Sequence, residues 1–222
     1  MDKIIIAAVV AVVVLIVTGF ISLDTWLTNR QVAGEVAQAS PKNDKNDKRS
    51  YARADPRPDE TPLPKDSLKN YMTAADTPRA VYVDKLNVAA RTIPLGVEPD
   101  GKIAAPQSVY DAGWYQGSVK PGETGAVVVD GHASGASKLG AFGKLAELNT
   151  GDVITLQTGN MKKFKYKVVK KEIVEASKVN MQKVMLPHGN ALEAANFITC
   201  AGDWTKDNST MTKRVVIYTE RV

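Results

Sequence analysis

The pattern of apolar and polar positions divides the chain into three parts. Residues 4–23 form one uncharged run, IIIAAVVAVVVLIVTGFISL. A helix of this length spans about 30 Å, the thickness of the hydrocarbon core of a bilayer. A cleaved signal peptide would have a shorter apolar core of about 7–15 residues, and the Ala37-Gln38-Ala39 motif lies well beyond this run. The pattern therefore favours an uncleaved membrane anchor over residues 1–23.

Residues 24–71 have the composition of a linker. The stretch 41–70 contains five prolines, mixed charges and no Ile, Val, Phe, Trp or Met. Such a segment cannot bury enough apolar surface to fold, so we expect it to be largely disordered. A signal-anchor with a short N-terminal tail normally exports the part of the chain on its C-terminal side. We therefore expect a single-pass protein of the cell membrane, with the linker and everything beyond it outside the cell.

Residues 72–222 change to short β-type runs divided by Gly, Pro, Asp and Asn. Many short strands with turn residues between them indicate an all-β sandwich or barrel, and about 150 residues can bury one core. Two short helical patterns lie at 140–148 and 191–196. The predicted strands are Val81–Val83, Val127–Val129, Val153–Leu156, Lys163–Val174, Phe197–Cys200 and Arg214–Thr219.

Charge and metal-ligand content exclude some function classes. The net charge is +5, but no basic run with interleaved aromatic residues occurs, so nucleic-acid binding has little support. One cysteine and two histidines are too few for a structural zinc site. No acidic cluster suggests a calcium site. We therefore expect no required metal or cofactor.

Cys200, in NFITCAGDW, is the only cysteine of the chain. An odd cysteine in an exported protein suggests an intermolecular disulfide or a reactive thiol. A buried cysteine can also serve as a small hydrophobic residue. The count alone leaves these alternatives open.

Two further residues at strand boundaries give the thiol a chemistry. His132 follows the valine run after Asp130-Gly131, and Arg214 begins the last run. If the strands ending in Cys200 and beginning at Arg214 are neighbours, the two residues lie close together. A thiolate attacks a carbonyl carbon, an imidazole transfers protons, and a guanidinium stabilises the oxygen that gains charge. Together these residue types indicate nucleophilic acyl transfer. His188, in LPHGN, is interpreted as a loop residue.

Three ordered motifs in residues 72–222 resemble the sortase family of cysteine transpeptidases. They are AGWYQGSVKPGETGAVVVDGHASG, FITC and TKRVVIYTERV. The resemblance implies an eight-stranded β-barrel after an N-terminal transmembrane helix, with 72–222 as the catalytic domain. It also implies Cys200 as nucleophile, His132 as general acid and base, and Arg214 as the oxyanion or substrate stabiliser. Thr199 matches the threonine before the nucleophile and is a candidate substrate-binding residue.

The resemblance also implies substrates and partners. These are surface proteins with a C-terminal sorting signal of the LPxTG type, and an amine acceptor such as a cell-wall precursor. We expect a monomer. The substrate groove is expected within 177–196, by family position. The motifs are most like class F or E, although Phe197-Ile198 and Ala201 depart from the commoner residues. The absence of a hydrophobic segment after Val222 disfavours the pilin-polymerising class.

Two alternatives stay open from the sequence. An L,D-transpeptidase is another envelope enzyme that uses Cys and His, but it places Ser-Gly before the cysteine, where this chain has Thr199. A membrane-anchored β-barrel that binds a partner without catalysis would have a buried and unreactive Cys200.

Overall fold

The computed structural model describes residues 57–207 and 209–222. The predicted anchor over 1–23, and the predicted linker up to residue 56, lie outside the described residues. Across the part of the chain that is described, no helix is long and apolar enough to cross a membrane.

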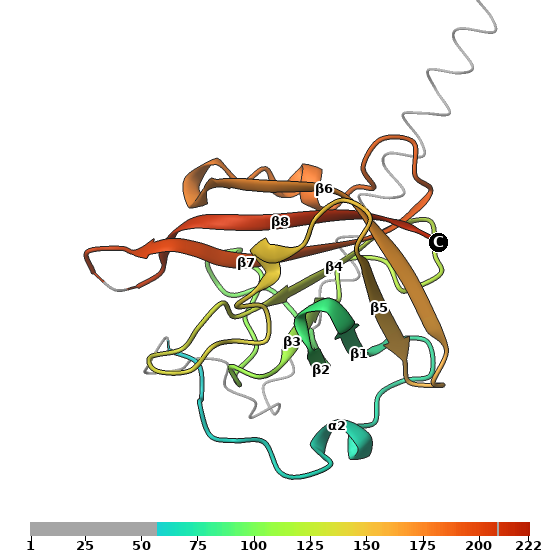
Figure 1. Ribbon diagram of the computed structural model, residues 1–222, viewed down its shortest axis with the longest axis horizontal. Helices are drawn as coiled ribbons and strands as arrows, with labels where there is room; N and C mark the ends of the chain where they lie inside the picture. The colour runs from blue at the N-terminus through green and yellow to red at the C-terminus, as the bar shows by residue number, and fades with distance from the viewer. Residues whose placement is uncertain (1–56, 208) are drawn as a thin grey trace, which may run out of the picture. The chain divides into compact units, whose positions relative to one another are not determined.

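Eight strands close into one barrel in the order β1-β2-β3-β4-β7-β8-β6-β5 (Figure 1). This confirms the predicted eight-stranded barrel. The strands are β1 (Pro78–Val83), β2 (Val88–Leu95), β3 (Ala112–Tyr115), β4 (Gly125–Gly131), β5 (Val153–Thr158), β6 (Lys163–Glu175), β7 (Glu193–Trp204) and β8 (Met211–Arg221).

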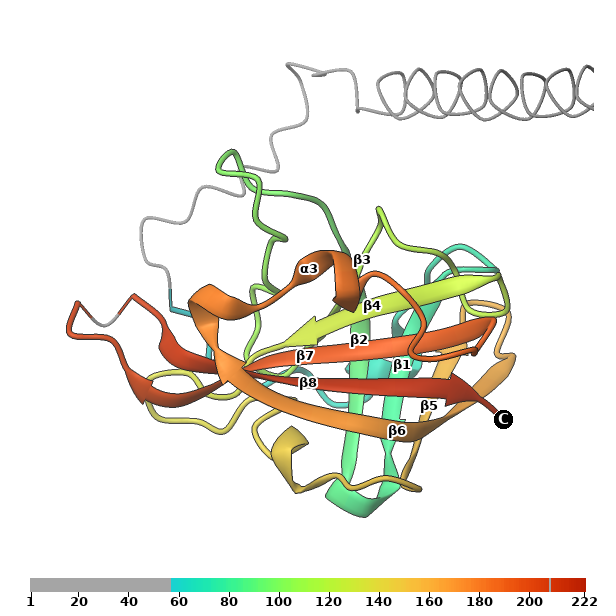
Figure 2. The same cartoon turned by 90° about the horizontal axis from the view of Figure 1, so that it is seen from above.

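Two of the strand pairs are parallel, and the second of them helps to form the site. β2 pairs with β3, and β4 pairs with β7, whereas the other neighbours are antiparallel. Parallel strands need a long crossover connection. The connection from β4 to β7 carries β5 and β6, so β4 and β7 lie side by side although they are far apart in the sequence (Figure 2).

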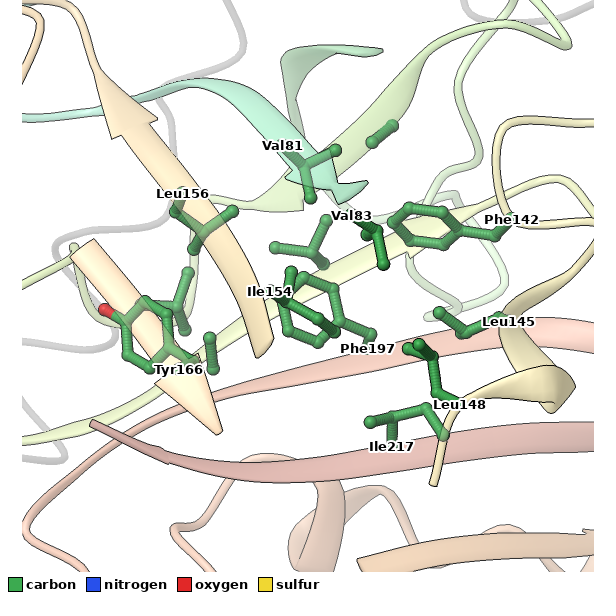
Figure 3. Close-up of a cluster of buried hydrophobic side chains, with 14 of the residues drawn as sticks. Val81, Val83, Phe142, Leu145, Leu148, Ile154, Leu156, Tyr166, Phe197 and Ile217 are labelled. Atoms are coloured by element: carbon green, nitrogen blue, oxygen red, sulfur yellow. The ribbon is translucent and has the colours of Figure 1, made fainter. Parts of the chain in front are cut away.

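The barrel interior is filled by side chains that alternate along the strands. Val127 and Val129 of β4 belong to one buried apolar cluster. Phe197 of β7 points into the same cluster (Figure 3). The rings of Phe197 and Phe142 meet edge to face, with centroids 6.1 Å apart. Because successive side chains of a strand point to opposite faces, the residues between these core positions lie on the outer face of the sheet.

Across residues 57–207 and 209–222, helical structure is confined to single turns. The short helices are α2 (Ser67–Asn70), α3 (Met181–Val184) and the 3₁₀ turns η1 (Asp84–Leu86), η2 (Leu145–Glu147) and η3 (Ala176–Lys178). The helical pattern at 140–148 yields only η2 within its range.

The predicted helix over 191–196 is wrong. Residues 193–196 begin β7 and pair with 125–128 of β4. Ala194, Ala195 and Asn196 are buried, and the Asn196 side chain donates to the carbonyls of Val184 and Leu186. The helical propensity of the alanines is overridden because a central strand position satisfies the backbone and buries the side chains.

Two strands escaped the sequence analysis. β2 carries Arg91 and Thr92 among its apolar residues, and β3 has only four residues. Arg91 makes a two-bond ion pair with the buried Asp111, at 2.8 and 2.6 Å. Arg91 interrupts the apolar pattern of β2 in the sequence, and in the fold its charge is paired with Asp111.

The described end of the expected linker packs on the barrel. The buried Arg79 of β1 donates to the carbonyl oxygens of Leu68, Lys69 and Tyr71. Tyr71 in turn donates to the carbonyl of Thr92 on β2. These bonds hold the chain around α2 against the first two strands.

Replacing Phe197 by Ala should destabilise the barrel, because it removes a fully buried ring from the centre of the core. We expect the free energy of unfolding, measured by denaturant titration, to fall by about 3–5 kcal/mol. Leu192→Ala, at a side chain that is 74% exposed just before β7, is the control and should change it little. Equal effects of the two substitutions would contradict this account of the core.

Candidate active site

Cys200 and Arg214 face each other across the antiparallel strands β7 and β8. They are direct partners in the register of the pair. The sequence placed both residues at strand boundaries. In the structure both strands run further, to Trp204 and from Met211. A bulge between Ala201 and Trp204 bends this extension, where Gly202 adopts a φ of 79° that favours glycine.

His132 reaches the same end of the barrel through the parallel pair β4–β7. Asp130 is the register partner of Ile198. His132 and Cys200 lie two residues beyond this pair on the two parallel strands. Because side chains alternate along a strand, both are expected on the same outer face as Asp130 and Ile198. The three candidate catalytic residues line one cleft. The structure therefore brings together residues that lie on three different strands or strand ends.

The His132 ring is oriented by a backbone carbonyl. Its Nε2 lies 2.7 Å from the carbonyl oxygen of Pro106. A carbonyl oxygen can only accept, so Nε2 carries a proton in this arrangement. The tautomer of the neutral ring then leaves Nδ1 as the basic nitrogen.

The Thr199 side chain points inward rather than toward the outer face. It is buried, and its hydroxyl donates to the carbonyl oxygen of Gly131 at 2.7 Å. This bond ties β7 to β4 between the nucleophile candidate and His132. The Thr199 hydroxyl thus holds the residue before Cys200 against the residue before His132.

The Arg214 guanidinium is held at the base of the β7–β8 hairpin. Nη1 donates to the carbonyls of Met211 and Lys213, and Nη2 donates to Thr210 Oγ1, each at 2.8 Å. These bonds use three of the five N–H groups of a guanidinium. They fix the plane of the cation while leaving donors for a further acceptor.

The cleft around these residues has a volume of about 830 Å³. Its lining comes from Arg57 and Pro58, Tyr115, and the segments 97–105, 130–134, 176–185, 198–204 and 209–214. The sequence analysis expected the groove within 177–196, and this region contributes Val179, Met181 and Met185. Arg57, Pro58 and the segment 97–105 lie outside the motifs recognised in the sequence, so no sequence signal identified them as cleft walls.

The α3 wall of the cleft is fastened to the sheet through Glu172. Its carboxylate lies 2.7 Å from Lys170 Nζ and 2.6 Å from Lys183 Nζ, and it accepts from the Tyr218 hydroxyl. Hydrogen bonds from Lys170 and Lys183 lower the pKa of Glu172 from 4.5 to about 2. Lys183 belongs to α3, so this cluster links the cleft wall to β6 and β8.

A second set of hydrogen bonds holds the segment before α2 near the loop that follows His132. The Glu60 carboxylate accepts from the backbone N–H groups of Ser137 and Lys138 and from the Ser137 hydroxyl. These bonds lower the pKa of Glu60. Asp59 also pairs with Ser108 in a β-bridge. Arg57 and Pro58 are thereby positioned at the cleft.

A cysteine, a histidine and an arginine around one cleft of a closed barrel are the components of a thiol-dependent acyl-transfer site. The model of the sortase domain matches residues 81–222. The chain therefore belongs to the sortase family of cysteine transpeptidases. No curated protein matches the chain.

Solved sortase structures share this fold. The chain is similar to the pilus-related sortase C of Group B Streptococcus, at 18% identity and a TM-score of 0.50, over 68% of this chain and 70% of that one. It is similar to sortase A from Corynebacterium diphtheriae, at 19% identity and a TM-score of 0.50, over 66% of this chain and 60% of that one. It is also similar to a histidine-to-aspartate variant of sortase C-1 from S. pneumoniae, at 17% and 0.51, over 68% of each chain. These likenesses show the fold alone.

Removing the Glu172 charge should make the free energy of unfolding less dependent on pH in the acid range. Because the pKa of Glu172 is lowered in the folded protein, its contribution is complete above pH 4.5 and is lost as the pH falls toward about 2. We expect Glu172→Gln to lower the free energy of unfolding by about 1–2 kcal/mol at pH 7, after allowing for partial exposure, and by less at pH 3.

Denaturant titrations of the wild type and the variant at both pH values measure this difference. Glu175→Gln, at an exposed carboxylate on the same strand, is the matched control and should have little effect at either pH. An equal loss at pH 7 and pH 3 in Glu172→Gln would show that the ion pairs do not fasten α3.

Proposed function

We propose that this protein is a membrane-anchored sortase that acts outside the cell on an LPxTG-type C-terminal sorting signal. The observation that carries the proposal is the convergence of Cys200, His132 and Arg214 on one cleft. The uncharged run at 4–23 supports the anchor, and the motifs favour class F or E. The reaction is transfer of the cleaved protein to an amine, such as that of a cell-wall precursor.

The first half of the reaction forms a thioester. The Cys200 thiol passes its proton to His132 Nδ1, and sulfur bonds to the carbonyl carbon of the scissile amide. Arg214 donates to the oxygen as it becomes negative. When the intermediate collapses, the carbon–nitrogen bond breaks, and His132 protonates the leaving amine.

The second half returns the enzyme to its starting state. The acceptor amine loses a proton to His132 and attacks the thioester carbon. Collapse breaks the sulfur–carbon bond, forms the new amide, and the Cys200 thiolate recovers its proton. The cycle needs no oxidant or reductant, because one amide replaces another.

Substitution of the three residues should separate these roles. We expect Cys200→Ala to abolish release of the C-terminal fragment from an LPxTG-type peptide, and His132→Ala nearly to abolish it. Arg214→Lys keeps the charge but loses the planar fork, so kcat should fall by about 10²–10³-fold. The assay uses the full chain in detergent, an amine acceptor and chromatographic detection of both products.

Arg221→Lys is the matched control, since Arg221 lies on the same strand β8 but outside the cleft. It should keep the wild-type rate. Undiminished activity of Cys200→Ala would refute the mechanism. A wild-type chain that neither cleaves nor transfers any such peptide would favour the alternative of a binding module without catalysis.

A further inference from the structure

Asp130 is an acidic residue on the floor of the candidate cleft that the mechanism above does not use. It lies on β4 between Gly113 of β3 and Ile198 of β7. It shares the outer face of the sheet with His132, two residues further along. It also lines the same cleft as Cys200.

One oxygen of this carboxyl is buried without a hydrogen-bond partner. Within the described residues, no donor reaches Asp130 Oδ1. A Cβ atom at Gly113 would lie 2.5 Å from this oxygen, so the glycine makes room for the carboxyl. Burial raises the pKa of Asp130 well above its usual range. This shift favours the protonated carboxyl, which can both donate and accept a hydrogen bond.

An unpaired buried oxygen is unfavourable for folding, and native proteins rarely keep one without a reason. Oδ1 itself is enclosed beside Gly113 and the buried Leu95 side chain, but Asp130 as a whole is only half-buried and lines the cleft. Arg57, Lys102 and Arg214 line the same cleft, with Lys102 paired to Asp100, so a substrate cation would approach a wall that carries basic side chains. An acidic substrate residue would face a carboxyl that can itself become negative. An uncharged polar group meets neither obstacle.

We propose that Asp130 is a specificity-determining residue that binds an uncharged hydroxyl or carboxamide side chain of the sorting signal. This inference rests on the proposed sortase function. Ile198 lies two residues from Cys200 on β7, a rise of about 6.6 Å. An extended peptide advances about 3.3 Å per residue, so the selected residue lies within two positions of the threonine that Cys200 attacks.

The test compares peptides that differ only in polarity. In an LPxTG-type peptide, the second and third positions, which lie two and one residues before the threonine, carry in turn Thr or Val, and Asn or Leu, which are matched in shape or size. With the full chain in detergent, we expect one position at which the polar member has a kcat/KM about tenfold higher. Asp130→Ala should reduce this ratio to about one while keeping cleavage of the apolar peptides. Asp130→Asn should retain the preference, because a carboxamide also donates and accepts.

Asp84→Ala, at an exposed aspartate of η1 outside the cleft, is the control and should keep the wild-type ratios. Should Asp130→Ala fail to fold, Asp130→Val replaces it, since β-branched residues suit a strand. Cleavage by the wild type without a polar preference at any position would overturn the role of Asp130 but not the sortase function. An unchanged polar preference in Asp130→Ala would likewise overturn the role of Asp130 and leave the sortase function standing. Failure of the wild type to cleave any peptide in the set would overturn both.

Discussion

The pairing of β7 with β8 is the constraint on which the candidate site depends. Its register makes Cys200 and Arg214 direct partners. A slip of one residue would turn either side chain into the barrel interior, because side chains alternate between the two faces. The core prevents such a slip, since Phe197, Val215 and Ile217 are all buried on the inner face. Core packing and catalytic geometry are therefore set by the same register.

The parallel contact of β4 with β7 completes the arrangement. It is buried on both sides, with Val127 and Val129 inside the barrel and Val128 in a second apolar cluster outside it. The outer cluster includes Val184 of α3 and Val216 of β8. Val179, Met185 and Ile198 pack against this outer cluster and also line the cleft. Polar and reactive side chains lie at the open end of β4 and β7.

The catalytic candidates could be identified from the sequence because each stands beside a strong strand signal. His132 follows three valines, Cys200 ends an apolar run, and Arg214 begins another. Their approach to one another could only be conjectured, because it depends on a parallel crossover and a hairpin register. Alternation of polar and apolar residues also predicted β6 well, since Phe164 and Tyr166 are buried and Lys163 and Lys165 beside them are exposed.

The elements that were missed have physical reasons. β2 carries a charge, that of Arg91, whose partner Asp111 is twenty residues away in the sequence. The alanines at the start of β7 favour a helix locally, and only the neighbouring strands make them a strand. Asp130 looked like part of a turn in DGH. Its burial became visible only when Gly113 and Ile198 were placed on either side of it.

The central claim is that Cys200 forms a covalent bond to the acyl half of the substrate. The most direct measurement is intact-mass spectrometry of the full chain, quenched in acid soon after mixing with an LPxTG-type peptide in the absence of an amine acceptor. The account predicts a mass increase equal to the acyl fragment, mapped to Cys200 after proteolysis and removed on addition of the acceptor. Product formation with no adduct, or an adduct at another residue, would contradict it.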